Sequence, residues 1–136
     1  TDMAMRYELT ADLMTGNTLI DTEHKQLFDA INSLMDACAQ GKGREKIMST
    51  AQFLEKYVDK HFGDEEGLQV KSKYPNYPAH KQFHDGYKRQ LDDTIQVLIT
   101  EGPTVKALGA LNQIVGVLVS HIRTEDKKLA RFIRGE

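Results

Sequence analysis

The sequence is poor in the residues that cross-link or interrupt a chain. Of its 136 residues, one is cysteine, three are proline and none is tryptophan. A single cysteine, Cys38, excludes an internal disulfide, so a hydrophobic core must supply the stability and a reducing compartment is the expected environment. The length suits one domain, and we therefore expect a cytoplasmic protein with a single domain over residues 1–136.

Excess charge and long apolar runs are also missing. The formal net charge is −2, which does not suit a domain that neutralises nucleic-acid phosphates. The longest apolar run, IVGVLV at 114–119, is too short to span a bilayer, and the first ten residues hold no apolar run of the signal-peptide type. We expect neither nucleic acid nor a membrane as a partner.

Helical periodicity is what the sequence has in abundance. Apolar residues recur at three- and four-residue spacing between clusters of glycine and proline, and no alternating strand pattern competes. We predict a first helix from Asp21, as an N-cap, to about Gln40, and a second from about Arg44 to Glu66, with Gly67 near its end. A third helix should begin at Pro78 and end before Gly102, and a fourth should run from about Thr104 towards Phe132. The short connections predict an all-α, up-down antiparallel four-helix bundle over residues 19–134, with residues 1–18 as an N-terminal arm.

The histidines fall on the apolar stripes of these predicted helices, and every helix contributes at least one. A single histidine on such a stripe is more often a hydrogen-bonded core residue than a ligand, but five would need five separate partners. A metal satisfies them together, because neutral imidazole is the commonest protein metal ligand. The five are His24, His61, His80, His84 and His121.

The spacing of these residues supports a shared site. His80 and His84 are four residues apart and lie on one helical face, as do His61 and Glu65. A carboxylate on an apolar stripe is costly without a cation, so Glu65 joins the candidate ligands. Histidines with few carboxylates suit zinc, iron or copper, and the H-E-x-x-H and Glu-x-x-His patterns are absent from the sequence. Two ions are the simplest reading of five histidines.

Four segments resemble the metal-binding motifs of the hemerythrins in their bacterial form, and they occur in the family's order. They are IDTEHKQLF (20–28), HFGDEE (61–66), HKQFH (80–84) and HIRTEDKKL (121–129). The resemblance extends over residues 13–129 and includes the lead-in TGNTLID (15–21). Bacterial members often carry a tryptophan near the N-terminus, and we expect Tyr7 to take its place in packing the arm.

The resemblance implies a non-haem di-iron centre with an oxo or hydroxo bridge. His80, His84 and His121 would hold one iron, His24 and His61 the other, and Glu65 and Asp126 would bridge them. This ligand set leaves one coordination position open, on the iron with two histidines, where dioxygen would bind reversibly. By helical position, the expected apolar lining of that pocket is Leu27, Ile31, Phe62 and Ile122.

Two functions are compatible with this ligand set. The first is reversible dioxygen binding for storage, delivery or sensing, and the second is a di-iron oxidase or peroxidase. We favour the binder, and not an enzyme, because no further titratable group on the stripes is placed to donate protons; a weak oxidase or peroxidase activity and a structural zinc bundle stay as alternatives.

Family members also occur as sensor ends of signalling proteins, so a signalling domain is a further expected partner if the chain is part of a longer one. The sequence indicates no oligomeric state.

Helical spacing and family resemblance disagree about the last ligand. Glu125 follows His121 by four residues and would share its face in a regular helix. Asp126 follows by five residues and would lie about 140° round the axis from His121. The resemblance selects Asp126. Asp126 can lie on the face of His121 within a helix only if the helix widens locally. We therefore predict a π-type turn between about His121 and Asp126.

Overall fold

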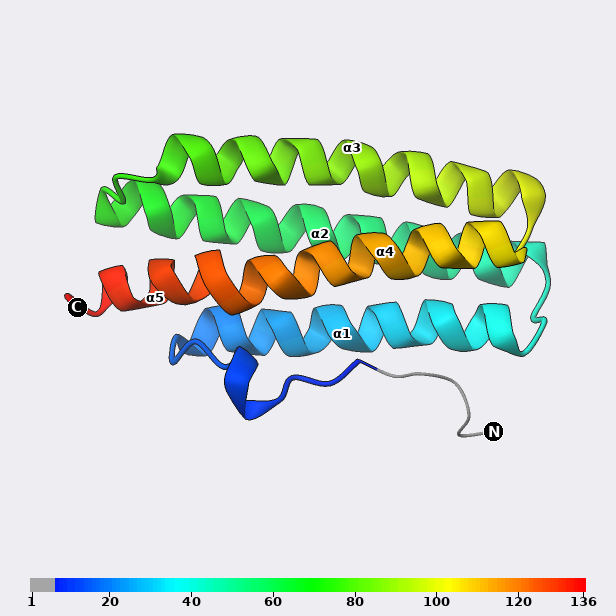
Figure 1. Ribbon diagram of the computed structural model, residues 1–136, viewed down its shortest axis with the longest axis horizontal. Coiled ribbons are helices and arrows are strands. Elements are labelled where there is room, and N and C mark those ends of the chain that lie inside the picture. Colours follow the sequence, from blue (N-terminus) through cyan, green and yellow to red (C-terminus); the bar gives the residue numbers. More distant parts are fainter. Residues whose placement is uncertain (1–6) are drawn as a thin grey trace.

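The computed structural model describes residues 7–136, which form four long helices and no strand (Figure 1). The helices are α1 (Thr18–Ala39), α2 (Arg44–Ser72), α3 (Tyr77–Glu101) and α4 (Val105–His121). They run alternately up and down, and each packs against the next one along the chain. A π-helical turn (Ile122–Asp126) and α5 (Lys127–Ile133) continue the line of α4. The predicted four-helix bundle is confirmed.

The first helix begins earlier than its sequence suggests. Its N-cap is Asn17, whose side chain accepts a hydrogen bond from the Ile20 backbone N–H at 3.0 Å. Asp21, predicted as the cap, is instead buried in the first turn and accepts hydrogen bonds from the backbone and hydroxyl of Thr15 at 2.9 and 2.8 Å. The prediction of Asp21 as N-cap was wrong because this carboxylate caps the preceding loop.

The second helix continues past its predicted end. Gly67 lies on the exposed face, where the lack of a side chain costs no packing, and α2 runs on to Ser72. It ends at Lys73, which adopts the left-handed conformation with φ 59° that often closes helices. The additional turns carry Gln69, which is fully buried, into the end of the bundle.

The buried side chains form two apolar clusters. The large one fills the bundle with the predicted stripes, including Leu54, Ile95 and Leu118. The small one, formed by Ile20, Tyr74 and Leu129, closes the end where α1 begins and α2 ends. The five histidines occupy the stretches of helix between the two clusters, so apolar packing encloses them from both sides.

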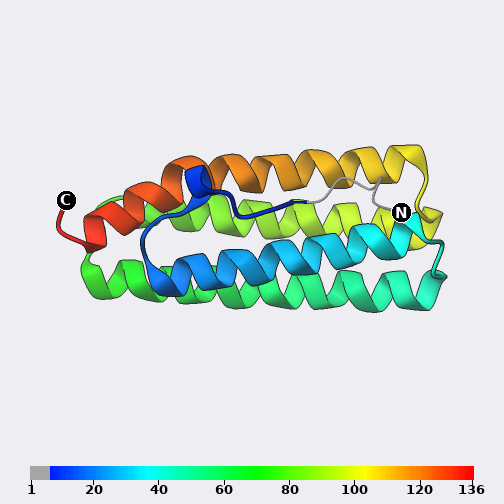
Figure 2. The same cartoon turned by 90° about the horizontal axis from the view of Figure 1, so that it is seen from below.

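Tyr7 fastens the described part of the arm to the bundle, as expected. Its backbone exchanges two hydrogen bonds with the Asn32 side chain, both at 2.8 Å, and its hydroxyl donates to Asn112 Oδ1 at 2.9 Å. Its ring lies 6.5 Å from that of Phe28. Figure 2 shows the arm crossing the outside of the bundle. Residues 1–6 of the predicted arm lie outside the described residues.

The last helical stretch of the chain is long and apolar enough to be compared with a membrane span, although its uninterrupted apolar runs are short. By length and composition, Val105–Ile133 could cross a membrane. Within the bundle, however, this stretch turns His121 and Asp126 inwards together with its apolar core residues. The length and apolar composition of this stretch therefore suit the core helix of a bundle as well as they suit a membrane span.

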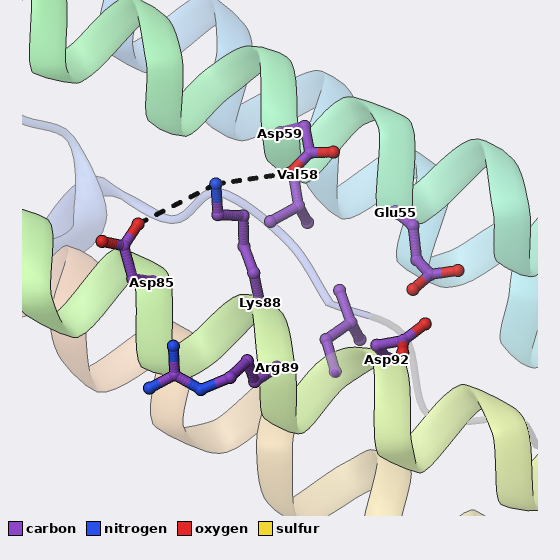
Figure 3. Close-up of a pocket in the computed structure, with 8 residues that line it drawn as sticks. Glu55, Val58, Asp59, Asp85, Lys88, Arg89 and Asp92 are labelled. Carbon is purple, nitrogen blue, oxygen red and sulfur yellow. Dashed lines mark ion pairs between the residues drawn. The ribbon is translucent and has the colours of Figure 1, made fainter.

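A charged groove runs between α2 and α3 on the outside of the bundle (Figure 3). At one end Lys88 Nζ lies 3.6 Å from Asp59 and 4.0 Å from Asp85. At the other end the carboxyl groups of Glu55 and Asp92 face each other from the two helices. The pKa of Glu55 is raised to about 7, mainly by burial and further by a hydrogen bond with Asp92 and the repulsion from its charge.

This carboxyl pair predicts a pH-dependent packing of α2 on α3. Because the pKa of Glu55 is higher in the folded state, its contribution to stability is present below about pH 4.5 and is lost as the pH rises towards 7. Glu55→Gln should therefore be more stable than the parent at pH 8, by about 1 kcal/mol after solvent screening, and close to it at pH 5. Urea unfolding at both pH values measures the difference. Asp93→Asn, an exposed neighbour, is the control; a gain of equal size at both pH values would contradict the prediction.

Candidate metal centre

All seven residues proposed as ligands meet in one buried layer of the bundle. They come from every long helix and from the π-helical turn, and none is more than 6% exposed. They are His24, His61, Glu65, His80, His84, His121 and Asp126. The sequence therefore selected residues that are far apart in the chain and close together in the fold.

Within this layer the side chains form two groups whose ligand atoms lie within 4.8 Å of one another. The first group holds three histidines with Glu65, and the second holds two histidines with Glu65 and Asp126. The histidines divide as the resemblance implied: His80, His84 and His121 in one group, and His24 and His61 in the other. In the first group His80 Nε2 and His121 Nε2 are 2.9 Å apart, close to the separation of about 3 Å expected of adjacent nitrogens on one ion with metal–nitrogen bonds near 2.1 Å.

The two carboxylates lie between the groups and face both. Glu65 turns Oε1 to His84 at 3.2 Å and Oε2 to His61 at 3.3 Å. Asp126 turns Oδ1 to His121 at 3.2 Å and Oδ2 to His24 at 3.0 Å. Each carboxylate thus offers one oxygen to each histidine group, which is the arrangement a bridging ligand requires.

The close contacts are poorly aligned for hydrogen bonding, and this fits a metal better than a network of protons. Among residues 7–136, His24 Nε2, His61 Nε2, His84 Nε2 and both oxygens of Glu65 have no hydrogen-bond partner, although each lies within 4 Å of an opposite group. Buried polar atoms without partners are costly. The ligand atoms of each group lie within 4.8 Å of one another, so one cation in each group would satisfy them together. Imidazole nitrogens with a few carboxylate oxygens suit a transition metal such as iron or zinc.

The predicted π-type turn is confirmed and places the last carboxylate. Residues Ile122–Asp126 form a π-helix, and Asp126 is 1% exposed. Glu125 points outwards, with its carboxylate 3.5 Å from Lys128 Nζ. The additional residue in this turn brings Asp126, and not Glu125, onto the face of His121.

The sequence reasoning missed a pair of carboxylates behind the histidines. Glu23 Oε1 lies 2.9 Å from His61 Nδ1 and its other oxygen lies 2.9 Å from Lys60. Glu66 Oε2 lies 2.9 Å from His84 Nδ1, and its other oxygen lies 3.7 Å from Lys81. Such contacts fix the orientation and tautomer of a metal-binding imidazole and raise its basicity. The available signal was that each carboxylate directly adjoins a ligand in the sequence.

Aromatic rings hold the histidines of the first group from the side. Phe62 stacks on His84 with ring centres 3.8 Å apart, and Phe83 stacks on His121 at 3.9 Å. Phe83 is not among the residues that the sequence pattern placed at the site. The residues predicted to line a dioxygen pocket are all at most 2% exposed: Leu27, Ile31, Phe62 and Ile122. Their role as a lining stays a prediction.

Charge compensation dominates the electrostatics of this layer. Burial lowers the pKa of His61, but the hydrogen bond with Glu23 and the nearby negative charge of Glu65 outweigh burial and raise it to about 10. The pKa of His80 is likewise raised to about 9 against the effect of burial, through Asp126 and Glu65. Burial raises the pKa of Glu65, yet the surrounding histidines hold it well below its usual value. The anionic carboxylates therefore require positive charge among the imidazoles, and protons and metal ions compete to supply it.

Comparisons with known proteins agree with this geometry. A family model described as the hemerythrin HHE cation binding domain matches residues 15–133. A bacteriohemerythrin of Pseudomonas aeruginosa strain LESB58 is 34% identical over 125 residues, covering 90% of this chain and 78% of that protein. A myohemerythrin of Sipunculus nudus is 34% identical over 113 residues, covering 81% of this chain and 79% of that protein. A crystal structure of a hemerythrin mutant superposes with a TM-score of 0.81 at 29% identity, over 96% of this chain and 98% of that one.

The choice of Asp126 over Glu125 gives a matched pair of substitutions. Asp126→Ala removes a carboxylate that faces both histidine groups, so we expect fewer bound metal ions per chain and a changed absorption spectrum. Glu125→Ala removes a solvent-facing neighbour and should leave both unchanged. Metal content and absorption spectra of the two purified variants measure the difference. Loss of metal in Glu125→Ala but not in Asp126→Ala would assign the bridge to Glu125.

Removal of the metal should destabilise the bundle, increasingly so at higher pH. Protonation of His61 and His80 compensates the buried carboxylates, but this stabilisation is fully present only below about pH 6.5 and is lost as the pH rises towards 9 to 10. We expect the metal-free protein to melt at least about 5 °C below the loaded protein at pH 8, with a smaller gap at pH 6.5. Calorimetry of chelated and reloaded samples measures this. Equal melting of the two forms at pH 8 would show that metal binding is not coupled to folding.

Proposed function

The chain belongs to the hemerythrin family, and from this premise we propose that its buried centre holds two iron ions and binds dioxygen reversibly. The observation that carries the proposal is the placement of Glu65 and Asp126, each with one oxygen towards either histidine group. Two metal positions that share two carboxylates need such a placement. A single structural ion would leave one group without a cation.

The division of the histidines assigns a role to each side of the centre. We infer that three histidines hold one iron and two hold the other, with an oxo or hydroxo bridge beside the carboxylates. His24 and His61 supply fewer protein ligands, so their side is the one to which we assign access for dioxygen. When bound, such an iron pair supplies the two electrons that reversible dioxygen binding requires.

The surroundings of the centre favour binding over reduction of dioxygen. The side chains of Leu27, Ile31 and Ile122 are apolar and fully enclosed, so they exclude water and the protons that it carries. The two tyrosines nearest by helical position are committed elsewhere: Tyr87 donates its hydroxyl to the Ile114 carbonyl at 2.9 Å, and the Tyr57 hydroxyl pairs with Gln26. Burial also raises the pKa of Tyr87. A reductase would need a proton donor at the centre, and the described residues place neither tyrosine there.

The cellular setting follows as part of the same proposal. A single buried cysteine, Cys38, suits the cytoplasm, where we place the protein. Storage, delivery and sensing of dioxygen all use the same reversible step, and a signalling partner applies only to sensing.

The decisive experiment distinguishes a binder from an enzyme. The protein is loaded anaerobically with ferrous iron, exposed to air and returned to vacuum while its visible spectrum is followed. A binder gains an absorption band in air and loses it under vacuum over repeated cycles. Continuous consumption of dioxygen or peroxide with an added electron donor would instead identify an oxidase or peroxidase, and a chain that takes up only zinc would be a structural bundle.

Two substitutions separate the ligands from the lining. His84→Ala removes an imidazole from the first group and should lower the iron content. Ile122→Ala shortens an apolar side chain beside His121, so the iron content should stay at the parent level while the dioxygen affinity or the autoxidation rate changes severalfold. Iron analysis and dioxygen titration of both variants make the comparison. Equal loss of iron in the two would show that Ile122 does not line the pocket.

A further inference from the structure

Gln69 is a buried polar side chain whose hydrogen bonds are unmade. It is 0% exposed, and neither its amide oxygen nor its amide nitrogen has a hydrogen-bond partner among residues 7–136. A glutamine amide offers two donors and an acceptor, and leaving such a group unpaired in the interior costs about 1–3 kcal/mol. Methionine or leucine would fill the same apolar space without this cost, so the amide needs a partner of its own.

The position of Gln69 places it beside the metal layer. It follows Glu65 by four residues on α2, which puts it on the same buried face about 6 Å further towards the end of the bundle. The Gln69 carbonyl accepts a hydrogen bond from the Tyr74 backbone N–H at 2.9 Å, and the Tyr74 ring meets His80 edge-on with ring centres 6.4 Å apart. Gln69, Tyr74 and His80 therefore share one corner of the bundle.

The register of the antiparallel helices identifies the histidine that Gln69 faces. On α2 and α3, Glu65 meets His84 at 3.2 Å and Glu66 meets His84 at 2.9 Å. Each step forward on α2 is opposed by a step back on α3, so Gln69 lies opposite His80.

His24 also has a buried Nδ1 without a hydrogen-bond partner among residues 7–136, but the α1–α2 register excludes it as the partner of Gln69. Glu23 faces His61 at 2.9 Å, so a residue eight positions after His61 lies opposite the chain near Thr15. Gln69 is therefore remote from His24 along the bundle.

His80 has a ring nitrogen that needs a hydrogen-bond acceptor. Its Nδ1 is buried and has no partner among residues 7–136, whereas the Nδ1 atoms of His61 and His84 each meet a carboxylate. A histidine that binds a metal through Nε2 almost always donates its Nδ1–H to an acceptor. His80 thus has a donor without an acceptor, and Gln69, in the same corner, has an acceptor without a donor.

We propose that Gln69 is the positioning residue of His80: its amide oxygen accepts the hydrogen bond of His80 Nδ1–H, directly after rotation of the side chain or through one bound water. Gln69 is then the uncharged counterpart of Glu23 and Glu66. An amide acceptor withdraws the proton less than a carboxylate does, so His80 is a weaker donor to its metal than His84 in the same group. The inference rests on the proposed metal centre but not on the reaction with dioxygen.

The experiment measures metal affinity and a single ring proton, without dioxygen. Affinity for Co²⁺ is determined by competition with a chelator for the parent chain, Gln69→Met, Gln69→Glu and Gln82→Met. Gln69→Met keeps the length of the side chain but has no amide, and should bind Co²⁺ about 10- to 100-fold more weakly. Gln69→Glu supplies a new acceptor and should recover at least part of that loss. Gln82→Met makes the same exchange at an exposed position between His80 and His84, and should match the parent.

A second measurement reports on the hydrogen bond itself. In the Zn²⁺-loaded parent, proton NMR should show an exchange-protected Nδ1–H signal for His80; Gln69→Met should lose it and keep the signals of His61 and His84. A cooperative melting transition of metal-free Gln69→Met, with the helical content of the parent, shows that the variant folds.

The outcomes separate this inference from the proposed function. Gln69→Met with parental Co²⁺ affinity and a retained His80 signal would overturn the role of Gln69 and leave the metal centre intact. No recovery in Gln69→Glu would also overturn it, since the loss would then not come from a missing acceptor. A parent chain that binds neither Co²⁺ nor Zn²⁺ would overturn both.

Discussion

The rest of the structure depends on the burial of two carboxylates between five imidazoles. Glu65 and Asp126 are each 1% exposed, and an uncompensated carboxylate in such a place would be far too costly to keep. Compensation requires that side chains from all four long helices reach one layer. This demand fixes the rotation of each helix about its axis, because turning any of them would remove a histidine from the layer and expose its apolar stripe.

The two apolar clusters on either side of this layer make the centre a closed environment. Burial of Leu, Ile and Phe side chains stabilises the bundle by about 1.5–3 kcal/mol each, and this stability supports a polar layer that would not assemble on its own. The same packing keeps water away from the ligands, which raises the strength of every electrostatic interaction among them. Stability and chemistry therefore use one set of side chains.

Irregularities of the backbone occur where the centre requires them. The π-helical turn Ile122–Asp126 interrupts an otherwise regular helix, and its additional residue is what turns Asp126 inwards. The extension of α2 beyond Gly67 places Gln69 in the corner of the bundle where the Tyr74 ring meets His80. Behind the ligands, Glu23 and Glu66 connect two imidazoles to the surface lysines Lys60 and Lys81, so orientation of the ligands is anchored at the outside of the bundle.

Most of the fold, the five histidines and Glu65 could be read from the sequence, because helical periodicity and the position of a residue on an apolar stripe are local properties. Asp126 came only from the family resemblance, since regular helical spacing favours Glu125. The π-type turn was also predictable, since the spacing of His121, Glu125 and Asp126 conflicted with the resemblance. The sequence did not reveal the capping role of Asn17, the full length of α2, or the partners Glu23, Glu66 and Phe83, because these depend on which residues face each other across neighbouring helices. Only the tertiary structure decided that Glu65 and Asp126 each offer one oxygen to either group, and that Gln69 lies opposite His80. The physical reason is that periodicity specifies the face on which a side chain lies, whereas the register between antiparallel helices is set by packing of the whole bundle.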